Sequence, residues 1–413
     1  MSKLEEMLKY VSEHNEFYRN RIKEYGITNP LDISQWPVLT RQELQQNRYN
    51  MFSDGDKSKY FNQQLRRQSS SGSSGIPVNV YWAYRDWYAS NILLWRKRLK
   101  WYGIKPKDRY VMFTLNAFEL TADGEKIHYR EDPTNILSIN VSLIQDDNGY
   151  DGLIGIINDF EPTWLYVQPF ILSKLIEAYG RTGNNPPNTL KYIESVGELL
   201  SSDLRRRATE LFKIPIANMY GSEEMNGIAL ECPNHHMHII EDNVEVEINT
   251  GKNIQKYGEG EAIITNLKNF GMPLIRYNQG DRICIEKNKH MCVYDNTSSI
   301  LEFIKGRQHE CINIDETNEL NTFILTEVIA EINNRFNDII KEYQFVYKKI
   351  SKTLLCYISI DSRSTKWFNN VKREIEIVFF KKIMYKNKIT IEIINVERVC
   401  NQEGKRKKFI IIE

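Results

Sequence analysis

Two stretches of the sequence combine residue types that can bind ligands. The first, residues 68–77, reads Gln-Ser-Ser-Ser-Gly-Ser-Ser-Gly-Ile-Pro and is the densest run of serine and glycine in the chain. Glycine lets the backbone approach an anion with its N–H groups turned inward, and serine hydroxyls donate further hydrogen bonds to phosphate oxygens. The run therefore predicts a phosphate-binding loop. It lacks the G-x-x-x-x-G-K-[ST] spacing of a Walker loop, and its composition alone favours a flexible linker.

The second stretch runs from residue 232 to residue 311 and holds four of the six cysteines and five of the seven histidines. Thiolate and imidazole are common ligands of Zn²⁺, so a metal site is one interpretation of this clustering. The other is that some of these residues fill the core, and Cys284 fits a buried position in a strand. Six cysteines in 413 residues are too few for a disulfide framework, and a cytosolic chain keeps them reduced.

Length and composition limit the class of protein. A chain of 413 residues is too long for one compact core and predicts two domains of unequal size. With 41% hydrophobic and 26% charged residues and a net charge of +1, it fits an ordinary globular protein without a nucleic-acid or membrane partner. We find no run of 18 apolar residues that predicts a transmembrane helix, and the first residues lack the apolar core of a signal peptide. We therefore expect a cytoplasmic protein, either a monomer or a homodimer.

An α/β arrangement is expected to position the two stretches. Helical spacing predicts helices over residues 3–25, 41–47 and 84–102. From residue 110 to residue 246 short apolar strands alternate with helices, which is typical of an α/β fold. Because the Ser/Gly run lies inside this continuous α/β sequence, its position argues against a linker between domains.

The pattern of predicted helices and strands changes twice in the second half of the chain. Residues 244–303 form short β runs broken by Gly, Asn and Asp, which predicts an antiparallel subdomain. After residue 306 the pattern changes to a compact α+β unit of about 100 residues, within the usual range of domain sizes. We therefore place the domains at residues 1–306 and 307–413.

The Ser/Gly run and four later motifs resemble those of a known superfamily. Ser-Ser-Gly-Ser-Ser-Gly-Ile-Pro is similar to [ST]-[SG]-G-[ST]-[ST]-G-x-P, the phosphate loop of the adenylate-forming enzymes (acyl-CoA synthetases, peptide-synthetase adenylation domains and luciferases). The other matches follow in the family's order: Tyr-Gly-Ser-Glu-Glu at 220–224, Leu-Ile-Arg-Tyr-Asn-Gln-Gly-Asp at 274–281, Gly-Arg at 306–307 and Gly-Lys at 404–405. Residues 15–19, 135–179 and 231–242 are closest to the phenylacetate-CoA ligase-like and CapK-like branch.

This resemblance implies a fold and a reaction. The fold is a large N-terminal adenylate-forming domain of α/β layers with a distorted β subdomain, followed by a small mobile α+β domain that carries a catalytic lysine. The reaction uses ATP and Mg²⁺ to convert a carboxylic acid into acyl-AMP with release of pyrophosphate. The acyl group then passes to a thiol, either CoA or the phosphopantetheine of an acyl or peptidyl carrier protein. An amine acceptor and a non-catalytic nucleotide-binding scaffold are the alternatives, and a binding module without a nucleotide site is a third.

The resemblance also assigns roles to residues that match the motifs. Lys405 would bridge the acid and the α-phosphate, and Glu224 would ligate Mg²⁺. Tyr220 would stack on adenine, Asn218 would read the adenine edge, and Asp281 and Arg307 would hold the ribose or phosphate. Arg276 either helps to position phosphate or pairs with a local carboxylate. The remaining nucleotide contacts are expected from Ser70, Ser71, Gly72, Ser73, Ser74, Gly75, Gly221, Ser222 and Glu223, and the acid pocket from Val196, Gly197, Glu198, Tyr220 and Gly221.

Three positions depart from the family's pattern. The phosphate loop ends in Ile76 where the family frequently has lysine, Glu223 replaces the usual threonine, and His309 replaces the usual hinge aspartate. The first half-reaction is therefore better supported than transfer to CoA.

A structural zinc site is a further implication of the branch. Some phenylacetate-CoA ligase-like proteins hold zinc through an E-C…H segment and a later C-x-C. Cys232 and His238 match the first part, and His290 with Cys292 would replace the second. His235 and His236 are rival ligands.

Overall fold

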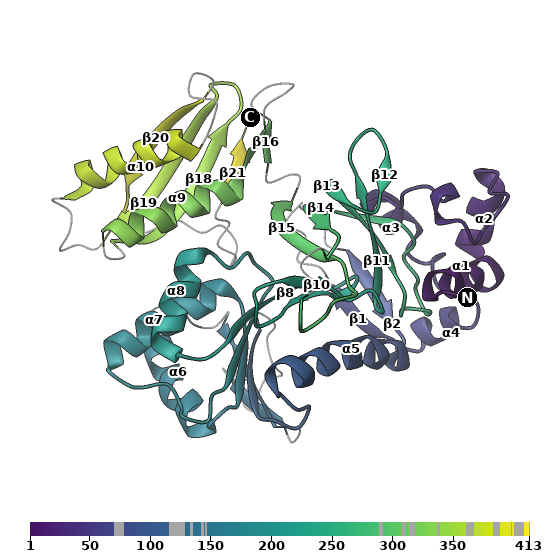
Figure 1. Cartoon of the computed structure of the whole chain (residues 1–413), viewed down its shortest axis with the longest axis horizontal. Helices are drawn as coiled ribbons and strands as arrows, with labels where there is room; N and C mark the ends of the chain where they lie inside the picture. The colour runs from purple at the N-terminus through teal and green to yellow at the C-terminus, as the bar shows by residue number, and fades with distance from the viewer. Residues whose placement is uncertain are drawn as a thin grey trace.

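The computed structural model describes residues 1–69, 78–114, 129–132, 135–141, 144, 147–288, 292–307, 311–313, 319–336, 339–360, 367–382, 389–397, 399 and 409–412. A mixed sheet of thirteen strands is the frame of the larger, N-terminal part (Figure 1). Its order is β12-β11-β13-β14-β15-β10-β9-β8-β7-β6-β3-β5-β4. None of the helices within the described ranges is both long enough and apolar enough to span a lipid bilayer.

One end of this sheet is parallel and covered by helices on both faces. The parallel strands are β3 (Tyr110–Thr114), β5 (Ile136–Asn140), β6 (Trp164–Val167), β7 (Tyr192–Val196) and β8 (Ile216–Ser222), with β4 (Tyr129–Asp132) antiparallel at the edge. Every residue of β7 is buried, as expected for a strand that is covered on both faces.

Alternate residues of these strands point to opposite faces of the sheet and pack in two different hydrophobic cores. Leu165, Val167 and Ile193 pack with one set of helices, namely α6 (Asp147–Phe160), α7 (Pro169–Thr182) and α8 (Ser202–Phe212). Trp164 and Tyr192 point to the opposite face, where they pack beside the long helix α5 (Tyr84–Tyr102). Helix α5 has the bounds predicted from the sequence and ends at Gly103, which adopts the left-handed conformation typical of a helix end.

The predicted antiparallel region is present, and it continues the same sheet. Its strands are β9 (Asn226–Glu231), β10 (Met237–Ile239), β11 (Val244–Asn249), β12 (Ile254–Gln255), β13 (Gly258–Asn266), β14 (Tyr277–Glu286) and β15 (Ile300–Arg307). Strand β8 joins the two regions because it pairs in parallel with β7 on one side and antiparallel with β9 on the other.

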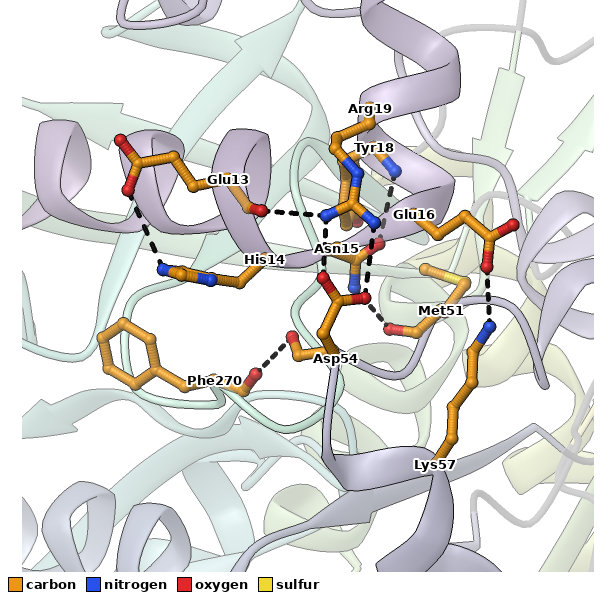
Figure 2. Close-up of polar contacts among 11 residues, drawn as sticks. Glu13, His14, Asn15, Glu16, Tyr18, Arg19, Met51, Asp54, Lys57 and Phe270 are labelled. Atoms are coloured by element: carbon orange, nitrogen blue, oxygen red, sulfur yellow. Dashed lines mark hydrogen bonds and ion pairs between the residues drawn. The ribbon is translucent and has the colours of Figure 1, made fainter.

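The N-terminal helices are α1 (Lys3–His14), α2 (Glu16–Glu24), α3 (Arg41–Asn47) and α4 (Asp56–Phe61), with a short 3-10 turn, η1, at Ile33–Gln35. The helical start predicted over residues 3–25 is confirmed, and a break at Asn15 divides it into α1 and α2. The buried Asn15 side chain accepts a hydrogen bond from the Tyr18 N–H at 3.2 Å, which caps α2, and donates one to the Met51 carbonyl at 2.9 Å. Figure 2 shows Arg19 reaching both Asp54 and the Glu13 carbonyl, so this break is fastened to the loop that follows α3.

The N-terminal segment is also attached to the strand region that contains the Leu-x-Arg-Tyr motif. The Tyr18 hydroxyl donates to the Pro273 carbonyl and accepts from the Ile275 N–H, both at 3.0 Å. The buried Arg276 guanidinium makes two 3.0 Å contacts with Glu247 and donates to the Trp36 carbonyl at 2.6 Å. Of the two roles considered for Arg276, pairing with a local carboxylate is the one that the structure shows.

The C-terminal part has a separate core built on a four-stranded sheet of order β20-β19-β18-β21. The strands are β18 (Ile340–Lys348), β19 (Thr353–Ile360), β20 (Thr390–Asn395) and β21 (Phe409–Ile412), accompanied by α9 (Thr322–Arg335) and α10 (Phe368–Lys382). The short strands β16 (Cys311–Asn313) and β17 (Glu319–Asn321) pair with each other ahead of α9. This part lies apart from the large sheet in Figure 1, with α9 next to α8. The division at residues 306 and 307 coincides with the end of β15 and stays a prediction.

A buried ion pair links α5 to the parallel sheet. Arg98 donates to both carboxylate oxygens of Glu194, at 2.8 and 2.6 Å, and the Tyr192 hydroxyl donates to the same carboxylate at 3.0 Å. The Arg98 guanidinium also packs over the rings of Trp95 and Trp164. The Glu194 charge is fully buried, so Arg98 is the group that makes its burial tolerable.

We predict that Arg98→Met lowers the free energy of unfolding by about 3–5 kcal/mol, because it leaves the Glu194 carboxylate buried without its counter-charge. Urea denaturation followed by tryptophan fluorescence measures this. Arg96→Met is the matched control, since Arg96 is exposed on the same helix, and it should stay within about 0.5 kcal/mol of the parent. A double replacement of Arg98 and Glu194 by apolar residues should recover most of the loss. A stable Arg98→Met single variant would contradict this role.

Candidate functional site

The Ser/Gly run connects two strands of one hairpin. Strand β1 (Arg66–Ser69) pairs antiparallel with β2 (Asn79–Trp82), with Ser69 opposite Asn79 and Arg66 opposite Trp82. A segment that leaves one strand and returns to its pairing partner belongs to a single domain, which argues against the linker interpretation. The predicted phosphate contacts stay predictions, because the residues concerned lie outside the described part of the chain: Ser70, Ser71, Gly72, Ser73, Ser74 and Gly75.

The Tyr-Gly-Ser-Glu-Glu motif ends β8 with Tyr220–Ser222 and enters the turn to β9 with Glu223 and Glu224. The pairing shifts register between Tyr220 and Gly221, and a Cβ atom at Gly221 would lie 2.4 Å from the Asn226 carbonyl oxygen. Only glycine fits such a close backbone approach. The Ser222 hydroxyl accepts the Met225 N–H at 3.2 Å and so helps to close the turn. The motif therefore lies where the parallel region of the sheet ends, the place where open α/β sheets bind ligands.

A hydrogen-bond network joins this turn to β14. The Tyr220 hydroxyl donates to Asp281 Oδ2 at 2.6 Å, and Gln279 Nε2 donates both to that carboxylate oxygen at 2.8 Å and to the Tyr220 hydroxyl at 2.6 Å. Ser222 donates to Gln279 Oε1 at 3.1 Å. Two motifs some 60 residues apart in sequence therefore meet in one polar cluster. In β15, Arg307 is the backbone pairing partner of Asp281, and its side chain lies outside the described part.

Gln279 is a site residue that the sequence analysis missed. The available signal was its spacing, since residues two apart on a strand share a face and Gln279 precedes Asp281 by two. Its amide orients both Tyr220 and Asp281.

The two adjacent carboxylates of the turn have different environments. Glu224 is only 3% exposed, whereas Glu223 faces solvent. Desolvation by the surrounding protein, and then the charge of Glu224, raises the pKa of Glu223, and Arg66 opposes this rise. Glu223 is therefore surrounded by protein on several sides and open to solvent on one side. Such an arrangement suits a carboxylate that meets a ligand.

The residues predicted for the acid lie at the end of the neighbouring strand. Val196 closes β7 opposite Met219 of β8, and Gly197 follows with a φ of +78°. A Glu198 carboxylate oxygen accepts the Phe170 N–H at 3.3 Å, so Glu198 serves the first turn of α7. Asn218 is half-buried on β8, one strand position before Met219. The structure thus places the predicted acid and adenine residues on adjacent strand ends.

Four potential metal ligands gather beside α5, near Trp101. Cys232, His236, His238 and Cys292 offer ligand atoms that all lie within 4.8 Å of one another. The two sulfur atoms are 3.7 Å apart, close to the roughly 3.8 Å that a tetrahedral zinc ion with Zn–S bonds of about 2.3 Å imposes. This donor set fits zinc.

The histidines of this segment take distinct positions. His238 Nδ1 contacts the Ser298 hydroxyl at 3.0 Å, while its buried Nε2 has no hydrogen-bond partner within the described ranges. Burial lowers the pKa of His238 to about 4, so the imidazole is neutral at neutral pH, the form that binds metals. His235 turns instead to Glu231, at 2.9 Å, and so is not among the gathered ligands. His290, the predicted fourth ligand, lies outside the described part, and His236 stands in the cluster.

Lys405, the predicted catalytic lysine, also lies outside the described part, so its role stays a prediction. The described site therefore consists of the β8–β9 turn, the Gln279–Asp281 segment of β14 and the end of β7.

Comparisons with known proteins agree with this architecture. No protein-family model matches the chain. Phenylacetate-coenzyme A ligase of Thermus thermophilus is 22% identical over 362 residues, covering 84% of this chain and 77% of that protein. The amide bond synthetase McbA of Marinactinospora thermotolerans has a similar structure, with a TM-score of 0.54 at 13% identity over 82% of this chain and 66% of that one.

The structures of 2-hydroxyisobutyryl-CoA ligase are more similar. In the postadenylation state with R3-HIB-AMP, the TM-score is 0.79 at 16% identity, over 99% of this chain and 88% of that chain. In the thioesterification state with 2-HIB-AMP and CoA, it is 0.60 at 19% identity over the same shares. The arrangement of this chain is thus closer to the postadenylation structure. Sequence similarity and the shared fold confirm the predicted resemblance: the chain has the fold of the adenylate-forming superfamily, with a large N-terminal and a smaller C-terminal domain.

Proposed function

We propose that this protein is an acid–thiol ligase that activates a carboxylic acid with ATP and transfers the acyl group to a thiol. The observation that carries the proposal is the polar cluster beside the Glu223–Glu224 turn, in which Tyr220 and Gln279 hold Asp281 and Ser222 holds Gln279. These residues come from separate motifs, and the folded chain assembles them at the end of the parallel sheet.

The nucleotide is proposed to lie across this cluster. The Tyr220 ring would pack against adenine, with Asn218 at the adenine edge, and the Asp281 carboxylate would accept the ribose hydroxyls with Arg307 beside it. Because the Tyr220 hydroxyl and the Gln279 amide already hold Asp281, little rearrangement is needed when the ribose arrives. Gly221 allows the close approach to the Asn226 carbonyl that forms this turn.

The central chemical difficulty is negative charge. ATP and a carboxylate repel each other, so preorganised donors and cations must stabilise the transition state. Carboxylate oxygens are the ligands that Mg²⁺ prefers, and Glu224 is proposed to hold the ion, with the more accessible Glu223 next to it. Bound Mg²⁺ neutralises phosphate charge. Lys405 is proposed to add a further positive charge between the acid and the α-phosphate.

The acid is assigned by the position of its pocket, and the acceptor by its chemical class. Val196, Gly197 and Glu198 are proposed to border an aromatic or small acid, since they lie beside the nucleotide residues on the adjacent strand. Of the acceptors, CoA is supported by the CoA ligases that share the fold, and a carrier-protein phosphopantetheine fits the same chemistry. The fold shared with an amide bond synthetase keeps an amine acceptor as the second candidate.

We extend the proposal to the organisation of the chain. Residues 1–306 would bind ATP and acid, and residues 307–413 would act as the mobile lid that carries Lys405. The low cysteine content supports a cytoplasmic location.

A structural zinc ion is also proposed, held by Cys232, His236, His238 and Cys292. It would tie β9 and β10 to the segment after β14 rather than take part in the reaction, because the cluster is separate from the Tyr220–Asp281 network.

The proposed function is tested by measuring pyrophosphate release from ATP over a panel of aromatic and small carboxylic acids. The panel is run alone, with CoA and with hydroxylamine, which traps acyl-AMP. We expect one acid class to release pyrophosphate and form a hydroxamate, and thiol addition to increase turnover. Binding of ATP without turnover on any acid would instead identify a non-catalytic scaffold.

We predict that Lys405→Ala slows acyl-AMP formation by about 10²–10³-fold, the typical loss for one preorganised charge-stabilising donor. Thiol transfer from supplied acyl-AMP should remain mostly intact. Lys407→Ala and Lys408→Ala are matched controls from the same basic segment and should keep near-parental rates in both steps. An equal loss in both half-reactions, or a larger effect at position 407 or 408, would refute the assignment.

For the metal site, we predict about one zinc per chain by mass spectrometry of the purified protein. Cys292→Ser should lose most of this zinc and unfold at a lower temperature, because a site that binds only the folded state stabilises it. Cys284→Ser is the control, since Cys284 lies on β14 outside the ligand cluster. Full zinc content in Cys292→Ser would exclude the proposed ligand set.

A further inference from the structure

Arg66 faces the β8–β9 turn from the neighbouring hairpin. It lies on β1 directly opposite Trp82 of β2, and directly opposed residues of an antiparallel pair point to the same face. Trp82 is fully buried on that face, and its indole N–H donates to the Glu223 carbonyl at 3.4 Å. Arg66 therefore faces the β8–β9 turn, while its neighbour Arg67 is exposed and donates to Asn79.

The Arg66 guanidinium is held in place by an aromatic ring, and its charge also acts on Glu223, whose pKa it lowers. The guanidinium lies 4.1 Å from the centre of the Trp87 ring, in the first turn of α5. Such stacking fixes the plane of the guanidinium and leaves its N–H groups directed outward at the edges. Its buried Nε has no hydrogen-bond partner, and Arg66 forms no ion pair, among the residues that the structure describes. Buried charged donors normally have partners, so a partner from outside the chain would complete this site.

Chemistry indicates that this partner is an anion, because Arg66 is a cation. The carboxylate of Glu223 interacts with Arg66, and ATP with a carboxylic acid adds further negative charge. A cation is therefore needed at the phosphates, and Ile76 occupies the position where the phosphate loop of similar enzymes frequently has lysine. Arg66 is three residues before the end of β1, on the strand that leads into the Ser/Gly run. Its planar fork of donors matches phosphate oxygens.

We propose that Arg66, oriented by Trp87, binds the β- and γ-phosphates of ATP and then the departing pyrophosphate. The inference rests on the proposed function. In that reaction a carboxylate oxygen bonds to the α-phosphorus while the bond from the α-phosphorus to the bridging oxygen breaks. Pyrophosphate leaves with that electron pair, and no proton is transferred. Arg66 stabilises the charge that accumulates on this leaving group.

The competing assignment is that Arg66 binds the carboxylate of the acid. The two differ in a measurable way, because AMP shares the adenosine and α-phosphate of ATP but lacks the β- and γ-phosphates. We therefore propose calorimetric titration of the full chain with ATP, pyrophosphate and AMP, together with the KM for an accepted acid. The variants are Arg66→Met, Arg66→Lys and the matched control Arg67→Met.

Arg66→Met should weaken ATP and pyrophosphate binding by about 10- to 100-fold, the typical effect of losing charge-assisted hydrogen bonds. Its AMP affinity and acid KM should change less than about twofold. Arg66→Lys should recover part of the ATP affinity, since it keeps the charge and loses the fork, and Arg67→Met should match the parent. The thermal unfolding temperature of each variant shows whether it is folded, and Arg66→Lys decides the question if Arg66→Met is not.

Three outcomes would overturn the assignment: unchanged ATP affinity in the Arg66 variants, equal weakening of ATP and AMP, or a rise confined to the acid KM. Failure of the parent protein to release pyrophosphate with any acid would refute the proposed function. The contrast between ATP and AMP would still decide whether Arg66 binds phosphates.

Discussion

The site depends on one strand that serves two kinds of sheet. Strand β8 pairs in parallel with β7 and antiparallel with β9, so the covered α/β layer and the antiparallel region share a single continuous frame. Changing direction requires a tight turn, and the close approach of Gly221 to the Asn226 carbonyl permits it. Because the parallel strands end at this turn, the same constraint that connects the two regions also exposes the polar groups of the motif. Fold and site are therefore products of one pairing arrangement.

The polar side chains of the site are held in place by their neighbours. The Tyr220 hydroxyl, the Gln279 amide and the Asp281 carboxylate hydrogen-bond to one another. The ion pair between Arg98 of α5 and Glu194 of β7 fixes α5 against the sheet, and α5 also carries Trp87. Preorganised groups lose less entropy on binding, and they suit a reaction whose main requirement is stabilisation of charge.

Helices and strands with strong periodicity could be predicted from local patterns in the sequence. The helix break and the roles of single side chains depend on contacts between residues far apart in sequence. Helices α3 and α5 have the predicted bounds, because helical spacing over a continuous run of residues marks each of them. The break at Asn15 was missed because its stabilising partner, the Met51 carbonyl, is 36 residues away. Arg276 had two possible roles in the sequence, and Glu247 on another strand determined which one holds. Gln279 stands at a position of the 274–281 motif that the family leaves variable. His236 and His235 could be separated only once their side-chain directions were known.

The attachment of the N-terminal segment has a practical consequence. Leu39 bridges to Tyr277, Tyr18 binds the backbone at Pro273 and Ile275, and Arg276 grips the Trp36 carbonyl. The first forty residues thus support strand β14, which carries Asp281, although they are far from it in sequence. A shortened fragment designed to begin at the phosphate loop would keep all five motifs and lose this support. In this protein, a minimal catalytic unit cannot be defined by its motifs alone.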